Sequence, residues 1–394
     1  MKSAEKFLNN FKLKFTNEIL QIKEKRVEVS RSAFKLKLKN SLRNLTPRII
    51  QNYLDSMQSL FGNGRNITNF HSFMNEFEDN FKVLLESLPI WTVTSLSIRS
   101  RIPLLKRLFD LVIIDEASQC NIPSMIPLFY RAKNVCIIGD DLQLRHISGI
   151  KIDEDIRLAN ECGVPHVGGR YSEESLFDRS LNVCKKSNIK DVFLNEHYRS
   201  HEDIMRFCNV NFYIPKKSRE MIHKTSESKL IFETQGIYWI DVTSNGETTK
   251  FKRNMYEVDR IIEVYNYYTS ESKNENVSFG ITTPFRNQGD AIREKLFDKK
   301  INGDKIIVLG DTVHKFQGDE RDVIFFSPVI SFEGTRGMKN FINYASPEIL
   351  NVAVSRARSA LIVVGDKAEC SNAGGVLRRL ADSAKIMEIN NNGI

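Results

Sequence analysis

The chain has 394 residues, of which 41% are hydrophobic, and this is enough for two or three domains with apolar cores. No apolar run approaches the roughly 20 residues that a membrane-spanning helix needs, and the Lys-rich amino-terminal end lacks the apolar stretch of a signal peptide. Six scattered cysteines without a C-x-x-C pair argue against a disulfide framework or a zinc site. We therefore expect a soluble protein of a reducing intracellular compartment, cytoplasmic or in a eukaryote nuclear, with no membrane partner.

The net charge of +8 is concentrated at the amino-terminal end. Residues 1–50 hold 13 of the 57 Lys and Arg residues but only 4 of the 49 Asp and Glu residues. A basic arm on a near-neutral body is typical of a protein with a polyanion partner. A solvated helix face with an ordinary charge bias explains the same numbers, and the sequence leaves both interpretations open.

Residues 1–88 are predicted to be helical. Thr46 followed by Pro47 is a helix-start signal, and residues 61–64 (F-G-N-G) are predicted to form a turn. Apolar residues recur at helical spacing in three stripes. The stripes are Leu8, Phe11, Phe15, Ile19 and Ile22; then Ile49, Ile50, Tyr53, Leu54 and Met57; then Phe70, Phe73, Phe77, Phe81 and Leu84. We expect their aromatic rings to pack between helices rather than to stack on bases.

From Pro89 the pattern changes to short β-rich segments that alternate with helices. Strands are predicted at residues 90–94, 111–114 and 135–138. The second is a run of apolar residues, which is typical of a strand buried on both faces of a parallel sheet. Strand, helix and strand at this pitch indicate a parallel sheet with crossover connections.

Two adjacent carboxylates, Asp115 and Glu116, follow the second strand at its carboxyl end, where open α/β sheets bind ligands. In a nucleoside triphosphatase the first would hold Mg²⁺, and the second would orient and deprotonate the attacking water. An acidic helix cap is the simpler explanation of such a pair on its own. Gln143, just past the next strand, favours the triphosphatase because a Gln there can sense a γ-phosphate.

Seven stretches resemble, in order, the motifs of superfamily 1 helicases, in the 5′-to-3′ branch that includes the nonsense-mediated-decay helicase. They are D-E-A-S-Q (115–119), G-D-D-L-Q-L (139–144), S-L-F-D-R (175–179), L-N-E-H-Y-R-S-H (194–201), G-I-T-T-P-F-R-N-Q (280–288), T-V-H-K-F-Q-G-D-E (312–320) and L-N-V-A-V-S-R-A-R (350–358). The resemblance covers roughly residues 89–368. Each motif is moderately specific, and seven in order are very specific.

The resemblance implies an α/β fold with two RecA-like parallel-sheet lobes, the first incomplete, behind an N-terminal helical arm. The expected boundaries are 1–88 for the arm, 89–189 for the remainder of the first lobe and 190–394 for the second lobe.

ATP and Mg²⁺ are the ligands that the resemblance implies. The implied catalytic residues are Glu116, Gln143, Arg199 and Arg356, and the implied nucleotide-binding residues are Asp115 (through Mg²⁺), Tyr198, Gly318 and Glu320. Arginines supplied across a cleft can stabilise charge on the γ-phosphoryl oxygens, although a surface ion pair explains either arginine on its own. Gly318 would let the backbone approach phosphate. Tyr198 would stack on adenine or pack in a core.

Single-stranded nucleic acid is the implied partner, with DNA somewhat favoured over RNA. Its contacts would come from Thr94, Ser95, Pro284, Phe285, Thr312 and His314. Hydroxyls and backbone amides at such positions grip phosphates without reading sequence. For Phe285, stacking on a base and packing in the core are equally compatible with the sequence.

One family element is not found in the 394 residues. The phosphate loop G-x-x-x-x-G-K-[ST], whose amides and Lys hold the phosphates, does not occur upstream of Asp115, where residues 62–65 (G-N-G-R) form the only Gly cluster. We therefore expect a helicase that lacks its amino-terminal portion, with the loop on an upstream segment or a separate polypeptide. The strand at 135–138 would then have an open edge.

Two functions follow. The first is an ATP-dependent helicase or translocase, present as a fragment that hydrolyses ATP negligibly alone. The second is a non-hydrolysing nucleic-acid-binding or scaffold protein that keeps the helicase fold.

Overall fold

The structure is a computed structural model that describes residues 2–42, 45–61, 70–98, 101–164, 170–243, 252–270, 274–298, 306–308, 320–331 and 336–388. The chain divides into two compact units. Unit 1 comprises Met1–Val112 and Pro123–Val135, and unit 2 comprises Ile113–Ile122 and Cys136–Ile394. The predicted turn at residues 61–64 falls almost entirely outside the described residues.

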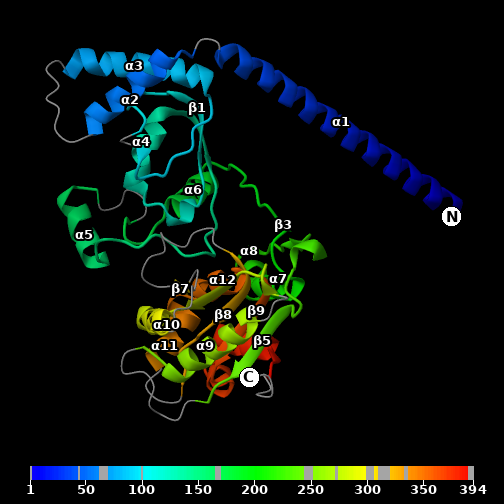
Figure 1. Cartoon of the computed structure of the whole chain (residues 1–394). Coiled ribbons are helices and arrows are strands. Elements are labelled where there is room, and N and C mark those ends of the chain that lie inside the picture. Colours follow the sequence, from blue (N-terminus) through cyan, green and yellow to red (C-terminus); the bar gives the residue numbers. More distant parts are fainter. Residues whose placement is uncertain are drawn as a thin grey trace. The chain divides into compact units, whose positions relative to one another are not determined.

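Three helices open unit 1, as their apolar stripes predict: α1 (Lys2–Leu42), α2 (Pro47–Phe61) and α3 (Phe70–Ser87). α1 is one uninterrupted helix (Figure 1). Its side chains from Gln21 to Asn40 are nearly all exposed to solvent. The helix is therefore held by few of its own apolar residues.

An aromatic cluster holds α2 against α3. The Tyr53 ring stacks on Phe77 at a centroid distance of 5.7 Å, and Phe81 packs against Trp91 at 5.0 Å. Phe77 and Phe81 are buried. The prediction that the aromatic rings of these stripes pack between helices is confirmed for this pair of helices.

The predicted strand at 90–94 is wrong. Residues 88–94 form no strand, because local contacts satisfy their polar groups instead. The Trp91 indole donates to the Leu88 carbonyl (2.6 Å), and the Ser97 amide donates to the Thr94 carbonyl (3.0 Å). A short β-branched run without a neighbouring strand gains more from such turns than from an extended conformation.

The next two predicted strands are present as β1 (Phe109–Ile114) and β2 (Ala132–Ile137), with α4 (Ile122–Arg131) between them. In the described part of the chain they form a two-stranded sheet. The prediction that β1 is buried on both faces is wrong, since the Leu111 side chain is 52% exposed and that of Ile113 is 59% exposed. A strand with a single neighbour has little to cover its faces.

A six-stranded sheet organises unit 2. Its strands are β5 (Gly236–Asp241), β6 (Phe279–Thr283), β7 (Ile306–Val308), β8 (Arg321–Phe326), β9 (Ala357–Gly365) and β10 (Lys385–Ile386). Their order is β10-β5-β9-β8-β6-β7, and every pair is parallel. The predicted α/β fold with a parallel-sheet lobe is confirmed here. A separate short pair joins β3 (Glu196–His197) to β4 (Ile222–His223).

Helices cover both faces of this sheet (Figure 1). Ile324 and Phe326 of β8 enter one core, with α7, α12 and α14, whereas Val323 and Phe325 enter the other, with α9 and α10. This alternation follows from the two-residue period of a strand. The helices of unit 2 are α5 (Ile152–Glu161), α6 (Leu176–Lys186), α7 (Glu202–Cys208), α8 (Ile214–Lys217), α9 (Met255–Ser270), α10 (Arg286–Asp298), α11 (Arg336–Asn340), α12 (Glu348–Ser355), α13 (Lys367–Asn372) and α14 (Gly375–Ser383).

Within the described ranges, no helix is both long enough and apolar enough to cross a membrane.

Candidate functional site

The two carboxylates after β1 have different environments. Asp115 is exposed, and its Oδ1 accepts a hydrogen bond from the Glu116 amide (2.9 Å). Glu116 is half-buried and lies in the left-handed backbone region at φ 52°, which is uncommon outside glycine. Burial raises the pKa of Glu116, Arg356 opposes the rise, and Asp115 and Asp140 add to it.

Gln143 and Arg356 meet although they come from distant segments. Gln143 lies in the loop after β2, and Arg356 ends α12. Arg356 Nη2 donates a hydrogen bond to Gln143 Oε1 over 3.2 Å. Arg356 is buried, and its Nε has no hydrogen-bond partner among the described residues. A buried donor of this kind favours an anionic or carbonyl ligand.

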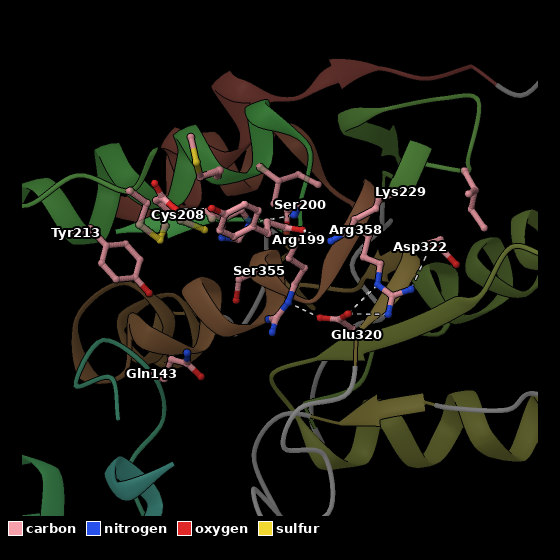
Figure 2. Close-up of a pocket in the computed structure, with 17 residues that line it drawn as sticks. Gln143, Arg199, Ser200, Cys208, Tyr213, Lys229, Glu320, Asp322, Ser355 and Arg358 are labelled. Carbon is pink, nitrogen blue, oxygen red and sulfur yellow. Dashed lines mark hydrogen bonds and ion pairs between the residues drawn. The ribbon is translucent and has the colours of Figure 1, made fainter. Parts of the chain in front are cut away.

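Glu320 holds two arginines. It forms an ion pair with Arg199 and accepts hydrogen bonds from Arg358 Nε (2.9 Å) and Nη2 (2.6 Å) (Figure 2). Arg358 Nη1 also lies 3.6 Å from Asp322. Each arginine is thus paired to a carboxylate while remaining about two-fifths exposed. An arginine in such a pair can exchange its carboxylate partner for another anion at a low cost in free energy.

A cavity of about 770 Å³ opens at these arginines. Its lining combines charged side chains with an apolar wall from α7. The lining includes Gln143, Glu196, His197, Tyr198, Arg199, Ser200, Ile204, Met205, Cys208, Tyr213, Met221, Lys229, Ile231, Glu320, Asp322, Ser355 and Arg358. Ser200 is fully buried, and its hydroxyl has no partner within the described part of the chain.

Two aromatic residues next to Arg199 differ in exposure. Tyr198 is 52% exposed, and a hydrogen bond from its hydroxyl to Glu196 raises its pKa. Its ring is therefore not packed in a core. His197 is largely withdrawn from water, and burial together with Arg199 and His223 lowers its pKa to about 4. Neutral His197 accepts a hydrogen bond at Nε2 from the Ser200 amide (2.9 Å).

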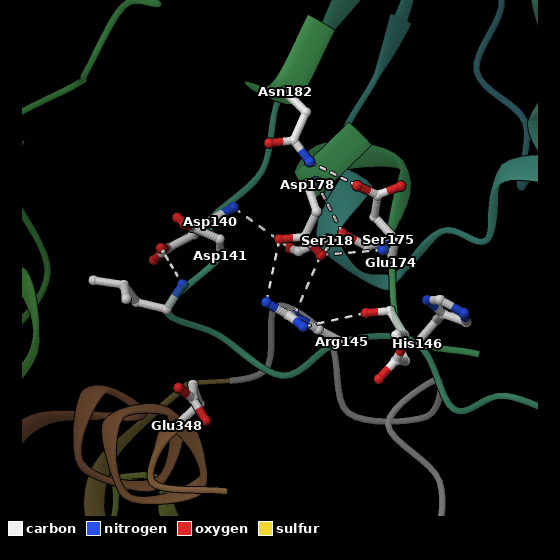
Figure 3. Close-up of polar contacts among 12 residues, drawn as sticks. Ser118, Asp140, Asp141, Arg145, His146, Glu174, Ser175, Asp178, Asn182 and Glu348 are labelled. Atoms are coloured by element: carbon white, nitrogen blue, oxygen red, sulfur yellow. Dashed lines mark hydrogen bonds and ion pairs between the residues drawn. The ribbon is translucent and has the colours of Figure 1, made fainter. Parts of the chain in front are cut away.

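A second polar network supports the carboxylate strand (Figure 3). Ser118 accepts a hydrogen bond from the Asp140 amide (3.4 Å), and Arg145 pairs with Asp178 at 3.3 Å. Asp178 and Ser175 form a reciprocal capping box at the start of α6. These contacts fix the segments on either side of Gln143.

The structure brings four of the predicted residues together. Glu116, Arg199 and Arg356 are close enough for each to shift the pKa of another, and Arg356 bonds Gln143. Glu320 joins the group through Arg199, while exposed Asp115 adjoins Glu116. Their catalytic and binding roles stay predictions.

The predicted nucleic-acid residues are less well supported. Thr94 and Ser95 are exposed in unit 1, where the Thr94 hydroxyl donates to Ser97 (2.9 Å). Pro284 and Phe285 are buried, and Phe285 is only 5% exposed, so core packing is the arrangement that the structure has. The Phe285 ring lies 6.1 Å from that of Phe341, and it is not presented as a stacking surface. Gly318, Thr312 and His314 lie outside the described residues.

Sequence reasoning missed several residues at the site. Asp140, Tyr213, Asn351 and Ser200 all contact the segments described above. Asp140 could have been predicted from the sequence as a site residue, because it follows β2 by three residues and precedes Gln143 by three. Asn351 lies within the motif at residues 350–358, although no role was predicted for it. Tyr213 carries no local signal, since a Tyr in an amphipathic helix is usually structural.

Two protein-family models, each described as an AAA domain, match residues 8–147 and residues 172–368, and the second alone spans half of the chain. The chain belongs to the superfamily 1 helicases. Within them it falls in the group that includes the nonsense-mediated-decay helicase.

Three relatives illustrate the similarity of this superfamily 1 chain to curated proteins. "Helicase sen1" of Schizosaccharomyces pombe is 28% identical over 66% of this chain and 14% of its own length. The "Uncharacterized ATP-dependent helicase MG140 homolog" of Mycoplasma pneumoniae is 27% identical over 72% and 25%. The "DNA polymerase alpha-associated DNA helicase A" of Schizosaccharomyces pombe is 29% identical over 66% and 37%. The matched region therefore spans well under half of each relative.

Among solved structures, the C-terminal domain of a possible DNA helicase from Lactobacillus plantarun aligns with 48% of this chain and 99% of that chain. The TM-score is 0.29 and the identity 15%, values too low to bear on function.

Proposed function

We propose that this chain provides part of the ATP site of a nucleic-acid helicase or translocase. The observation that carries the proposal is the hydrogen bond between Arg356 and Gln143 beside Glu116. A carboxylate, an amide and a buried arginine at one point are the groups that ATP hydrolysis requires for water activation and for charge on the γ-phosphoryl oxygens. Arg356 Nε is buried and has no hydrogen-bond partner among the described residues, which supports an anionic ligand there.

Each residue has a chemical task in this proposal. Asp115, exposed after β1, is the candidate to hold Mg²⁺, which would neutralise phosphate charge. Glu116, whose pKa is raised by burial, is the candidate to accept a proton from the attacking water. Gln143 would orient that water. Arg199 and Arg356 would stabilise the developing negative charge.

In this proposal Glu320 would have to release Arg199 when a phosphate binds. Arg199 is neutralised by Glu320 in this structure, and Arg358 competes for the same carboxylate. When a phosphate approaches, Arg358 can keep Glu320 satisfied while Arg199 turns to the phosphate. This exchange would couple nucleotide binding to movement of the segment around Arg199.

Within the superfamily, the phosphates are held by a loop that these 394 residues do not contain. We infer that Mg-ATP binds this chain weakly and that the chain alone hydrolyses it negligibly. The loop would come from an upstream segment or a separate polypeptide. The alternative function, a nucleic-acid-binding or scaffold protein without hydrolysis, rests on the same missing sequence.

Single-stranded nucleic acid is the proposed partner, with DNA somewhat favoured over RNA. The basic residues of α1 and the exposed Thr94 and Ser95 support backbone contacts that do not depend on sequence. Binding should accordingly weaken steeply as salt is raised.

The test is the binding of labelled single-stranded DNA and RNA to the purified chain, followed by fluorescence anisotropy with and without Mg-ATP. If the chain is part of a motor, Mg-ATP should change the affinity of the wild type for single-stranded nucleic acid but should not change that of Arg356→Ala. The control is Arg378→Ala, which removes an exposed arginine of α14 that pairs only with Asp382 among the described residues. Single-strand affinity that ignores nucleotide in every variant would favour the non-hydrolysing alternative.

A further inference from the structure

A buried tyrosine reaches the loop that carries Gln143. Tyr213 is 8% exposed, and its hydroxyl donates a hydrogen bond to Asp140 Oδ2 over 2.5 Å. Tyr213 ends a π-helix, Asn209–Tyr213, that joins α7 to α8. Single-turn π-helices are rare and frequently lie at functional sites. The proposed function assigns no role to either residue.

Asp140 continues the contact toward the arginine. Its Oδ2 also accepts a hydrogen bond from Gln143 Nε2 (3.3 Å), and its Oδ1 accepts one from the Leu142 amide (2.9 Å). Gln143 Oε1 then accepts from Arg356 Nη2. A continuous path thus runs from Tyr213 through Asp140 and Gln143 to Arg356. Figure 2 shows Tyr213 and Gln143 toward one end of the cavity, with Lys229 and Asp322 toward the other.

The chemistry of these groups fixes the direction of every bond. Arginine can only donate, and an ionised carboxylate can only accept. The Gln143 amide must therefore turn its nitrogen to Asp140 and its oxygen to Arg356. Burial and the neighbouring Asp140 raise the pKa of Tyr213, so the phenol keeps its proton and donates it.

Two further contacts hold the same loop from α8 and α12. Asn351 Nδ2 donates to the Leu142 carbonyl (2.8 Å), and Lys217 forms an ion pair with Asp141. Asn351 is buried, and Lys217 is about three-quarters buried. Since the ion pair of Lys217 with Asp141 does not involve Tyr213, loss of the Tyr213 hydroxyl should alter the Gln143 amide before it unfolds the loop.

We propose that Tyr213 is a positioning residue of the nucleotide site, which acts through Asp140 to orient the Gln143 amide and, through it, Arg356. This inference rests on the proposed function. It adds a residue that reaches Gln143 and Arg356 through Asp140.

A double-mutant cycle tests it on the full chain. Mg-ATP affinity is measured for the wild type, Tyr213→Phe, Gln143→Ala and the double variant. Tyr213→Phe should weaken binding by about fivefold to tenfold, as expected for the net contribution of one ordinary hydrogen bond. The same substitution should have no effect when Gln143 is already Ala. Tyr265→Phe, a buried tyrosine of α9 in the other core, is the matched control.

A second measurement needs no nucleotide. The Leu142 amide, held by Asp140 Oδ1, should exchange its hydrogen faster in Tyr213→Phe than in the wild type or in Tyr265→Phe. Asp140→Asn provides an independent variant, because it keeps an acceptor for Leu142 while it offers Gln143 a donor. It should weaken Mg-ATP binding as Tyr213→Phe does.

The outcomes separate the two claims. Equal weakening by Tyr213→Phe in both backgrounds would show a merely structural role, and an unchanged affinity or unchanged amide exchange would likewise overturn the inference. If the wild type binds no Mg-ATP, the proposed function fails. The exchange measurement then still decides whether Tyr213 holds the loop.

Discussion

Arg356 donates a hydrogen bond to Gln143 from 213 positions further along the chain. Arg356 also lies close enough to Glu116 to lower the pKa of that carboxyl, which burial raises. The pair therefore joins the loop after β2 to the C-terminal end of α12.

Removing the charge of Glu320 should strengthen anion binding. Glu320 neutralises Arg199 and Arg358 together, so Glu320→Gln leaves Arg199 without its carboxylate partner and Arg358 with Asp322 alone. We expect pyrophosphate to bind Glu320→Gln several-fold more tightly than the wild type, with a steeper dependence on salt. Isothermal titration with pyrophosphate measures this without involving the base or the ribose. Glu348→Gln, which removes the partner of Lys216, is the control, and equal tightening there would point to a general charge effect.

Acid should destabilise unit 2 through His197. Its pKa is lowered from 6.5 to about 4 by burial first, then by Arg199 and His223. Between these values the unfolded chain binds a proton that the folded chain does not, so His197 contributes stability above pH 6.5 that is lost as pH falls toward 4. Urea denaturation at several pH values should show that the free energy of unfolding falls less steeply with decreasing pH for His197→Gln than for the wild type. Parallel curves would contradict the assignment.

The buried carboxyl of Glu257 should act in the opposite direction. Burial raises its pKa to about 8 despite hydrogen bonds from Ser327 and the Val329 amide (3.0 Å). The folded chain then binds a proton that the unfolded chain releases, so this contribution is complete below about pH 4.5 and declines as pH rises toward 8.

Glu257→Gln should therefore reduce the loss of stability between pH 5 and pH 8, because the amide is neutral throughout. Urea midpoints at the two pH values measure the difference for each protein. A wild type whose stability is the same at both, after correction for His197, would show that Glu257 does not hold its proton as described.

A methyl group at Gly365 should be poorly tolerated. A Cβ there would lie 2.7 Å from Pro328 Cγ and 3.2 Å from Glu257 Oε1. We expect Gly365→Ala to lower the free energy of unfolding by about 1–3 kcal/mol, as for other overpacked core sites. Gly149→Ala is the matched control, since nothing lies within 4 Å of its added Cβ. Similar urea midpoints for the two variants would contradict this packing.

The resemblance to the helicase motifs predicted the parallel-sheet lobe of unit 2, but not which residues would form its strands. Val323–Phe326 are apolar on both faces, which is how a strand covered by helices on each side looks in a sequence. Gln143 and Arg356 were each recognisable from their motifs. Their contact was not, because a hydrogen bond between segments 213 positions apart leaves no trace in either local pattern.

The errors have physical causes too. Residues 90–94 are β-branched and apolar, yet a strand needs a neighbour, and local turns satisfied these residues instead. The same lack of a second neighbour left Leu111 and Ile113 exposed on β1. Phe285 after Pro284 fits an exposed wedge and a core side chain equally well, and only the packing against Phe341 separates them. Tyr213 gave no signal because its function depends on where a π-helix points its hydroxyl.

The most direct test of the account is a Mg-ATP titration of the purified chain, followed by isothermal calorimetry. The variants are Arg199→Ala, Arg356→Ala and, as the control, Arg378→Ala. The account predicts weak binding to the wild type and to Arg378→Ala, and a loss of about tenfold or more when either of the other two arginines is removed. Equal affinity in all four proteins would contradict a nucleotide site at Arg199 and Arg356.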